Sequence, residues 1–273
     1  MSVQKEASGR RSIQVEVEVP GTPEEVWQAI ATGPGISSWF VPTEIQERVG
    51  GTAVSHFGPG MDSNATVTAW EPPRRFAAES GDFGPNAPLI ATEWVVEARS
   101  GGTCVVRVVH SLFASTDDWD DQLESVESGW PAFFRILRLY LTHFRGEPCS
   151  TFQVMGFAPE PDSEAWDALT RSLGLGGAVV GQRRNTSEGA PALTGVVQGV
   201  REGSHPYALV LLDEPVPGAA FLNAGAMGGQ VFISMMFYFY GERAAAAAAR
   251  DEPLWRAWMN EHFPAASEAN SAG

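Results

Sequence analysis

The sequence is poor in basic residues and in cysteine, and it has no long apolar run. It carries 18 Lys and Arg against 33 Asp and Glu, a formal net charge of −15, and Lys5 is its only lysine. This charge makes nucleic acid and anionic membrane surfaces poor partners. No apolar run reaches the roughly 18 residues that a membrane-spanning helix needs. The first residues lack the apolar stretch of a signal peptide, so we expect a cytoplasmic protein.

Groups that would support covalent or metal chemistry are also sparse. Cys104 and Cys149 are the only cysteines and show no CxxC spacing, so we expect two free thiols. No two histidines have metal-ligand spacing on one helix, so we expect no metal site. His110 and Ser111 would point to opposite faces of a strand and therefore cannot form a nucleophile–base pair. The glycine pairs mark turns and form no phosphate-binding loop, so we expect no cofactor and no catalytic residues.

The chain contains an internal repeat. The segment 12–30 (SIQVEVEVPGTPEEVWQAI) aligns without a gap with 151–169 (TFQVMGFAPEPDSEAWDAL), 139 residues further on (151 minus 12). Six of the 19 positions are identical, among them Trp27 and Trp166. Both copies read as an alternating strand, a proline break, an acidic helix start and a tryptophan on the helix. Because repeats determine the fold, two domains of similar plan are expected.

In the first half, a strand over 12–19 precedes a short helix that starts at Thr22-Pro23-Glu24-Glu25, a capping-box pattern. Short strands separated by glycine and proline turns follow from about 44 to 113, which predicts an antiparallel sheet. After the acidic stretch 117–127, aromatic and apolar residues from Trp130 to Phe144 recur at i, i+3 and i+4, which predicts a long helix with one aromatic face.

The second half follows the same plan in shorter form. Strands are predicted at 151–158, 176–183, 193–201, 207–212 and 230–240, with helices at 162–173 and 242–263. Trp130 and Trp255 are 125 residues apart rather than 139, so the second copy lacks about 14 residues of its middle. Its strand 230–240 is crowded with Phe, Met and Tyr, which should leave less empty space.

The strand 103–113 indicates where a ligand would lie. Cys104, Val106, Val108, His110 and Leu112 share one face, and Arg107 marks the other as outward. The inward face should meet the Trp130 helix, with His110 either as the polar group of an apolar pocket or as a hydrogen-bonded core residue. The candidate ligand-binding residues are Trp39, Phe57, Trp70, Trp94, His110, Trp130, Phe133, Phe134 and Leu137.

The first half resembles the START-like (SRPBCC) superfamily, and within it the branch of the activator of heat-shock-protein ATPase homologue and the calicheamicin-resistance type. Over residues 12–141 the resemblance is carried by 22–27 (TPEEVW), 39–40 (WF), 70–76 (WEPPRRF), 102–103 (GT), 110–111 (HS) and 129–130 (GW). It implies the α+β helix-grip fold, an antiparallel sheet wrapped around a long C-terminal helix.

The second copy is similar mainly through the repeat and is expected to be abbreviated. We expect the following parts: a flexible N-terminus over 1–11, a complete helix-grip domain over 12–146, a shorter one over 151–263 and a disordered tail over 264–273.

Fold alone does not fix the function, because the superfamily includes lipid carriers, hormone receptors, polyketide cyclases and chaperone partners. The leading hypothesis is non-catalytic binding of a small apolar or aromatic ligand in the cavity of the first domain. The alternatives are a chaperone-activator-like protein-interaction module with a protein partner, and a cyclase- or hydrolase-type enzyme that uses the same cavity. The sequence leaves the choice open, although it favours a protein that is not an enzyme.

Overall fold

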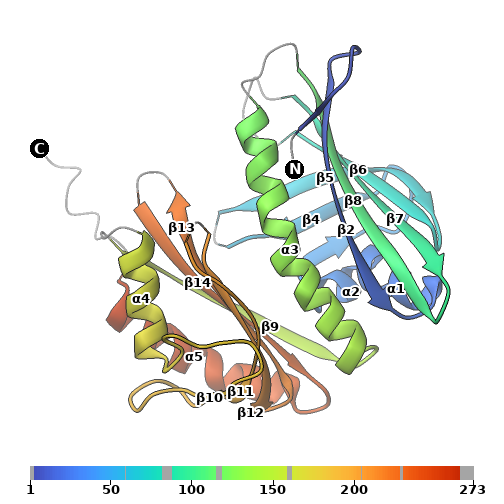
Figure 1. Cartoon of the computed structure of the whole chain (residues 1–273). Coiled ribbons are helices and arrows are strands. Elements are labelled where there is room, and N and C mark those ends of the chain that lie inside the picture. Colours follow the sequence, from blue (N-terminus) through green and yellow to red (C-terminus); the bar gives the residue numbers. More distant parts are fainter. Residues whose placement is uncertain are drawn as a thin grey trace, which may run out of the picture. The chain divides into compact units, whose positions relative to one another are not determined.

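The computed structural model describes residues 3–58, 60–81, 88–114, 119–158, 162–203, 205–227 and 230–264. The chain divides into two compact units, Met1–Arg145 and Gly146–Gly273. Each unit has one antiparallel sheet and ends in a long helix (Figure 1). The α+β class predicted from the sequence is therefore confirmed.

None of the described helices is long and apolar enough to cross a membrane. The predicted tail lies, from residue 265 onward, outside the described residues, as do residues 117 and 118 of the acidic stretch.

The first unit is an eight-stranded sheet with three helices in the described residues. In chain order its elements are β1 (Gln4–Lys5), β2 (Arg10–Pro20), α1 (Pro23–Ala31), α2 (Gly33–Ser37), β3 (Thr43–Ile45), β4 (Thr52–His56), β5 (Asp62–Glu71), β6 (Arg75–Ser80), β7 (Ile90–Arg99), β8 (Thr103–Phe113) and α3 (Asp120–His143). The strand order is β1-β2-β8-β7-β6-β5-β4-β3, so the first long strand pairs with the last one. The strands from β3 to β8 follow one another in the sheet, and β2 is added beside β8. The helix α3 packs against β2.

The N-terminal segment differs from the flexible terminus that the sequence indicated. Gln4 and Lys5 pair with Ser12 and Arg11 of β2 as a short antiparallel strand. The Lys5 ammonium also lies 2.7 Å from the carboxylate of Asp120, in the first turn of α3, and Arg11 binds the same carboxylate. Polar composition suggested a frayed end, but these ion pairs give the basic residues a defined partner.

The start of α1 has the capping box that its sequence predicts. The Thr22 hydroxyl accepts a hydrogen bond from the Glu25 amide at 3.3 Å, and the Glu25 carboxylate accepts one from the Thr22 amide at 2.8 Å. Arg145, just beyond α3, binds the same Glu25 carboxylate and lowers the pKa of that group. The end of the long helix is thereby attached to the start of the first one.

The second unit is a six-stranded sheet with two helices in the described residues. Its elements are β9 (Cys149–Ala158), α4 (Asp162–Ser172), β10 (Arg183–Asn185), β11 (Thr194–Arg201), β12 (Tyr207–Glu214), β13 (Gly218–Met227), β14 (Gln230–Tyr240) and α5 (Ala244–His262). The strand order is β10-β11-β12-β13-β14-β9, so here too the first strand pairs with the last. Segment 176–183, predicted as a strand, is instead mostly turns, and β13 was not predicted.

The two units repeat one topology. The offset of 139 residues carries the start of β2 at Arg10 to the start of β9 at Cys149, and the start of α1 at Pro23 to that of α4 at Asp162. Trp27 and Trp166 are both buried, with 4% and 5% of their surface exposed. The second unit has no counterpart of α2 among the described residues and has a smaller sheet, as expected for an abbreviated copy.

Candidate functional site

The first unit encloses a cavity of about 590 Å³ between its sheet and α3. That volume lies within the usual range of sites for small molecules, roughly 300–1,000 Å³. The wall is contributed by α2 and the residues after it, by every strand from β3 to β8, and by α3. Most of the lining is apolar, and within the described part of the chain it includes no lysine or arginine.

Small side chains on the sheet create this space. The inward positions of β4, β5 and β6 carry alternating alanine and serine: Ala53 and Ser55, Ser63 and Ala65, Ala78 and Ser80. Close packing would normally fill such an interior, but these residues are too short to reach the opposite helix. On that helix, Gly129 also lines the cavity, and a Cβ atom added there would meet nothing within 4 Å.

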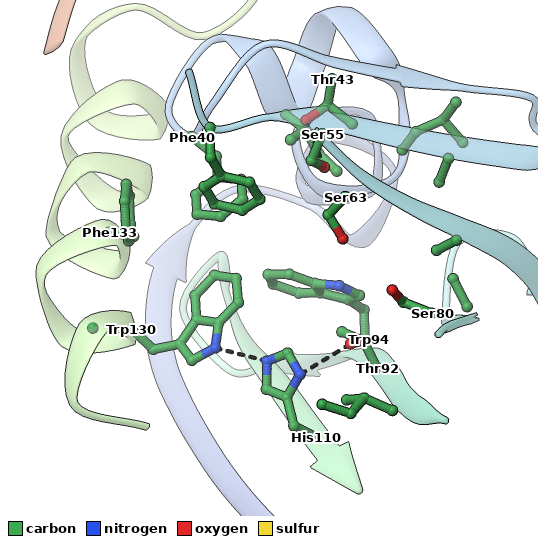
Figure 2. A pocket seen from close by; sticks show the side chains of 18 of the residues that line it. Phe40, Thr43, Ser55, Ser63, Ser80, Thr92, Trp94, His110, Trp130 and Phe133 are labelled. Carbon is green, nitrogen blue, oxygen red and sulfur yellow. Dashed lines mark hydrogen bonds between the residues drawn. The ribbon is translucent and has the colours of Figure 1, made fainter. Parts of the chain in front are cut away.

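Aromatic rings from α3, from the residues after α2 and from β7 line another part of the cavity (Figure 2). Phe40 packs on Phe133 with ring centroids 4.6 Å apart and stacks on Trp130 at 5.3 Å. Trp94 from β7 meets Trp130 edge-on at 5.1 Å. Trp39 is fully buried, and its indole N–H donates to the Ala29 carbonyl at 2.8 Å, so only its ring faces the cavity. A flat apolar ligand would therefore meet aromatic faces on this side.

Hydroxyl groups line the sheet side. Figure 2 shows Thr43, Ser55, Ser63, Ser80 and Thr92 along this wall, opposite the aromatic rings of α3. They come from five consecutive strands, β3 to β7. Thr43 lies directly opposite Ser55, and Ser55 opposite Ser63, in the strand register. The cavity thus has one aromatic side and one side with a row of hydroxyls.

His110 of β8 connects the two sides. Its Nε2 lies 2.7 Å from the indole nitrogen of Trp130, and its Nδ1 lies 2.9 Å from the hydroxyl of Thr92 (Figure 2). An indole N–H can only donate, so Nε2 must be the acceptor. The single proton of the neutral ring is then on Nδ1 and is donated to Thr92.

The surroundings of His110 keep it neutral. Only 8% of the residue is exposed, and burial lowers the pKa of its imidazole to about 4, because the charged form loses its hydration. Protonation would also place a second N–H against the indole N–H of Trp130. With both ring nitrogens engaged and the pKa low, His110 is poorly suited to act as a general base near neutral pH.

The structure brings six of the nine predicted ligand-binding residues to this cavity: Trp39, Phe57, Trp94, His110, Trp130 and Phe133. His110 faces inward beside Trp130, as the alternation of β8 predicted. Trp70 is placed elsewhere, against Trp27 at 5.2 Å. Phe134 and Leu137 are buried behind the lining, with Phe134 packed on Trp130 at 5.4 Å. These three residues do not line the cavity.

Sequence reasoning missed Phe40 and the hydroxyl row. Phe40 follows Trp39 directly, and in the sequence it stood out only as part of the 39–40 (WF) pair of the family resemblance. The serines and threonines are polar residues in strands, which usually face solvent. The signal that would have found them is the alternation of alanine with serine at every second position of three consecutive strands.

The second unit fills the corresponding space. In the first unit Ile13 of β2 pairs with His110, and 139 residues later Phe152 of β9 pairs with Phe237. Phe237 therefore takes the place of His110. It is fully buried, stacks on Phe152 at 4.6 Å and contacts Trp255 at 5.0 Å. The unit has a pocket of about 280 Å³, but that pocket lies beside α4, where it is lined by residues such as Trp166 and Arg171.

Neither Cys104 nor Cys149 is in a disulfide bond, as predicted. Cys104 is fully buried, and its sulfur lies 3.3 Å from the Gly21 carbonyl oxygen. Burial raises the pKa of this thiol. A raised pKa reduces the thiolate fraction, so Cys104 is suited to packing rather than to nucleophilic chemistry.

Comparison with known families identifies the first unit. Residues 20–142 match the family described as activator of Hsp90 ATPase homolog 1-like protein. The first unit is therefore similar to this family over most of its length. The match begins at the end of β2 and runs through α3, so it covers the cavity-forming elements that the sequence resemblance indicated. The comparison with curated proteins gives no match.

Several solved structures are similar to the chain. CalU16 from Micromonospora echinospora is 20% identical, covers 52% of this chain and 83% of its own, and has a TM-score of 0.41. DynU16 from the dynemicin biosynthetic locus is 17% identical over 91% of this chain and 93% of its own, with a TM-score of 0.43. The di-domain ARO/CYC BexL from the BE-7585A biosynthetic pathway is 15% identical over 94% and 99%, with a TM-score of 0.44.

Proposed function

We propose that the first unit binds a small apolar or aromatic ligand, without catalysis, in the cavity between its sheet and α3. The observation that carries this proposal is the cavity itself. About 590 Å³ is left open by short residues on the sheet and is faced by aromatic rings. An interior of this kind loses packing energy unless something occupies it. We further propose that the second unit, with Phe237 in place of the histidine, has a structural role.

Two features favour binding over catalysis. The one buried titratable group of the lining among the described residues, His110, has both ring nitrogens in hydrogen bonds. Asp62 also lines the cavity, but it is exposed at the mouth and pairs with His56 at 2.9 Å. Neither arrangement holds a free acid or base over the aromatic wall. A catalytic role would need a base within reach of the bound molecule.

The proposal is tested with N-phenyl-1-naphthylamine, a neutral probe that fluoresces in apolar surroundings. The full chain should bind it saturably with one molecule per chain. Ala65→Phe places a ring in the cavity from the inward side of β5, and we expect it to weaken binding at least about tenfold, equivalent to about 1.4 kcal/mol.

Thr66→Phe is the matched control. Thr66 is the next residue of β5 and is exposed on the other side of the strand. This variant adds the same ring without entering the cavity, so its affinity should stay close to that of the wild type. The proposal fails if the wild-type chain shows no saturable binding, or if Ala65→Phe and Thr66→Phe bind the probe equally well.

A further inference from the structure

The polarity of the hydrogen-bond chain determines what the cavity offers to a ligand. Trp130 donates to His110, and His110 donates to Thr92. The Thr92 oxygen is thus used as an acceptor, and its own hydrogen remains available. Among the described residues the Thr92 hydroxyl makes no other hydrogen bond, and the Thr92 side chain lines the cavity. The protein therefore presents a hydroxyl donor there, with its oxygen held by a buried ring.

The hydroxyls at the other end of the row have a different polarity. Thr43 donates its hydrogen to the Val41 carbonyl at 2.9 Å. In the 3.1 Å contact between Thr43 and Ser55, Ser55 must then be the donor, since Thr43 has no hydrogen left. The hydrogen of Ser55 is therefore used within the protein. Thr92 and Ser55 both line the cavity, and of these two hydroxyls only that of Thr92 has a hydrogen to donate.

The charge of the cavity restricts the acceptor further. Its lining has no lysine or arginine among the described residues, and its buried histidine is neutral. Asp62 at the mouth and the net charge of −15 oppose an anion. A carboxylate or phosphate buried here would have no counter-charge, which is costly. A neutral oxygen acceptor has no such penalty.

We infer that Thr92 orients the ligand by donating a hydrogen bond, and that the ligand is a neutral aromatic molecule with a carbonyl-type oxygen at its β7 end. This inference rests on the proposed function and specifies the ligand class of the same cavity. Thr92 is the residue that contacts the ligand. His110 and Trp130 are positioning residues, because they fix the rotamer and the free hydrogen of the threonine hydroxyl.

The test uses two probes that differ in one group. The first is 6-propionyl-2-(dimethylamino)naphthalene, whose ketone oxygen is an acceptor and whose emission moves to longer wavelength when that oxygen accepts a hydrogen bond. The second is 6-propyl-2-(dimethylamino)naphthalene, which has no carbonyl. Both are titrated into the full wild-type chain and into Thr92→Val, Thr92→Ser and Ser55→Ala.

We expect Thr92→Val to weaken binding of the ketone about fivefold to tenfold, the usual worth of one hydrogen bond. It should leave the carbonyl-free probe within about twofold, and the emission of the bound ketone should move to shorter wavelength. Thr92→Ser keeps the hydroxyl and should retain the wild-type values. Ser55→Ala removes a hydroxyl that has no hydrogen to spare and should leave the ratio of the two affinities unchanged. If Thr92→Val does not fold, Thr92→Ala replaces it as the hydroxyl-free variant.

Each outcome has a distinct meaning. If both probes bind but their affinity ratio is the same in the wild type and in the hydroxyl-free variant, the inference about Thr92 is overturned while the proposed function stands. If Ser55→Ala changes the ratio as much as Thr92→Val does, the assigned polarity is wrong. If neither probe binds the wild-type chain, the proposed function fails, and this inference fails with it.

Discussion

Replacing Trp27 by alanine should remove about 3–5 kcal/mol from the free energy of unfolding of the first unit, the usual cost of deleting a large buried aromatic side chain. Trp27 is 4% exposed and makes edge contacts with Trp70 at 5.2 Å and with Phe76 at 6.2 Å. The substitution therefore leaves a hole between α1 and the two strands that carry these rings. No neighbouring side chain of the cluster can close it without losing its own contacts.

The measurement is amide hydrogen exchange read on peptides of β8, because exchange through unfolding reports the stability of the unit that contains them. Trp166→Ala is the matched variant at the equivalent position of the repeat, and its effect should appear in peptides of β14. Phe113→Ala is the control, since Phe113 is 66% exposed and should change stability by less than about 0.5 kcal/mol. A Trp27→Ala chain with unchanged exchange in β8 would show that Trp27 does not support the core of the first unit.

The second large effect concerns pH. The pKa of His110 is lowered by burial from 6.5 to about 4. As the pH falls below 6.5, His110 becomes protonated in the unfolded chain, whereas in the folded chain it stays neutral until about pH 4. The free energy of unfolding therefore decreases as the pH falls through this interval, and a pKa difference of this size corresponds to about 3 kcal/mol in total. Above pH 6.5 both states hold the ring neutral, and the contribution is fully present.

His110→Gln isolates this contribution. Glutamine has an oxygen that can accept from Trp130 and an amide that can donate to Thr92, but it does not titrate. Urea unfolding at a series of pH values between 7 and 4 should show a shallower loss of stability in His110→Gln than in the wild type. His143→Gln, at an exposed position near the end of α3, is the control for replacing a histidine by glutamine. Parallel curves for the wild type and His110→Gln would show that the histidine is not buried in its neutral form.

Much of the architecture could be predicted because local and global signals agree. The capping box at Thr22 and the alternation of β8 each indicated the element that formed, and the repeat predicted the shared topology. Strand β13 was not predicted because its sequence, GAAFLNAGAM, is rich in glycine and alanine, which have little preference for strands. Its pairing with β12 and β14 is decided by those neighbours and not by its own residues.

The candidate site could be predicted in part. Aromatic residues at helical spacing on α3 pointed to Trp130 and Phe133, and the inward face of β8 pointed to His110. Empty space is harder to predict, because it depends on which short side chains of separate strands face one another. The position of Trp70 was also hard to predict. β5 has a register shift between Val67 and Ala69, so a simple alternation along the strand does not predict that Trp70 lies against α1.

The central claim, that a small aromatic ligand occupies the cavity of the first unit, is tested most directly by following the indole N–H signals of the nine tryptophans by nuclear magnetic resonance. N-phenyl-1-naphthylamine is titrated into the ¹⁵N-labelled full chain, and the signals are assigned by single substitutions. We predict that the signals of Trp39, Trp94 and Trp130 shift in step with probe occupancy, while those of Trp166, Trp255 and Trp258 stay in place. Shifts confined to Trp166, Trp255 and Trp258 would place the ligand in the second unit and contradict the account.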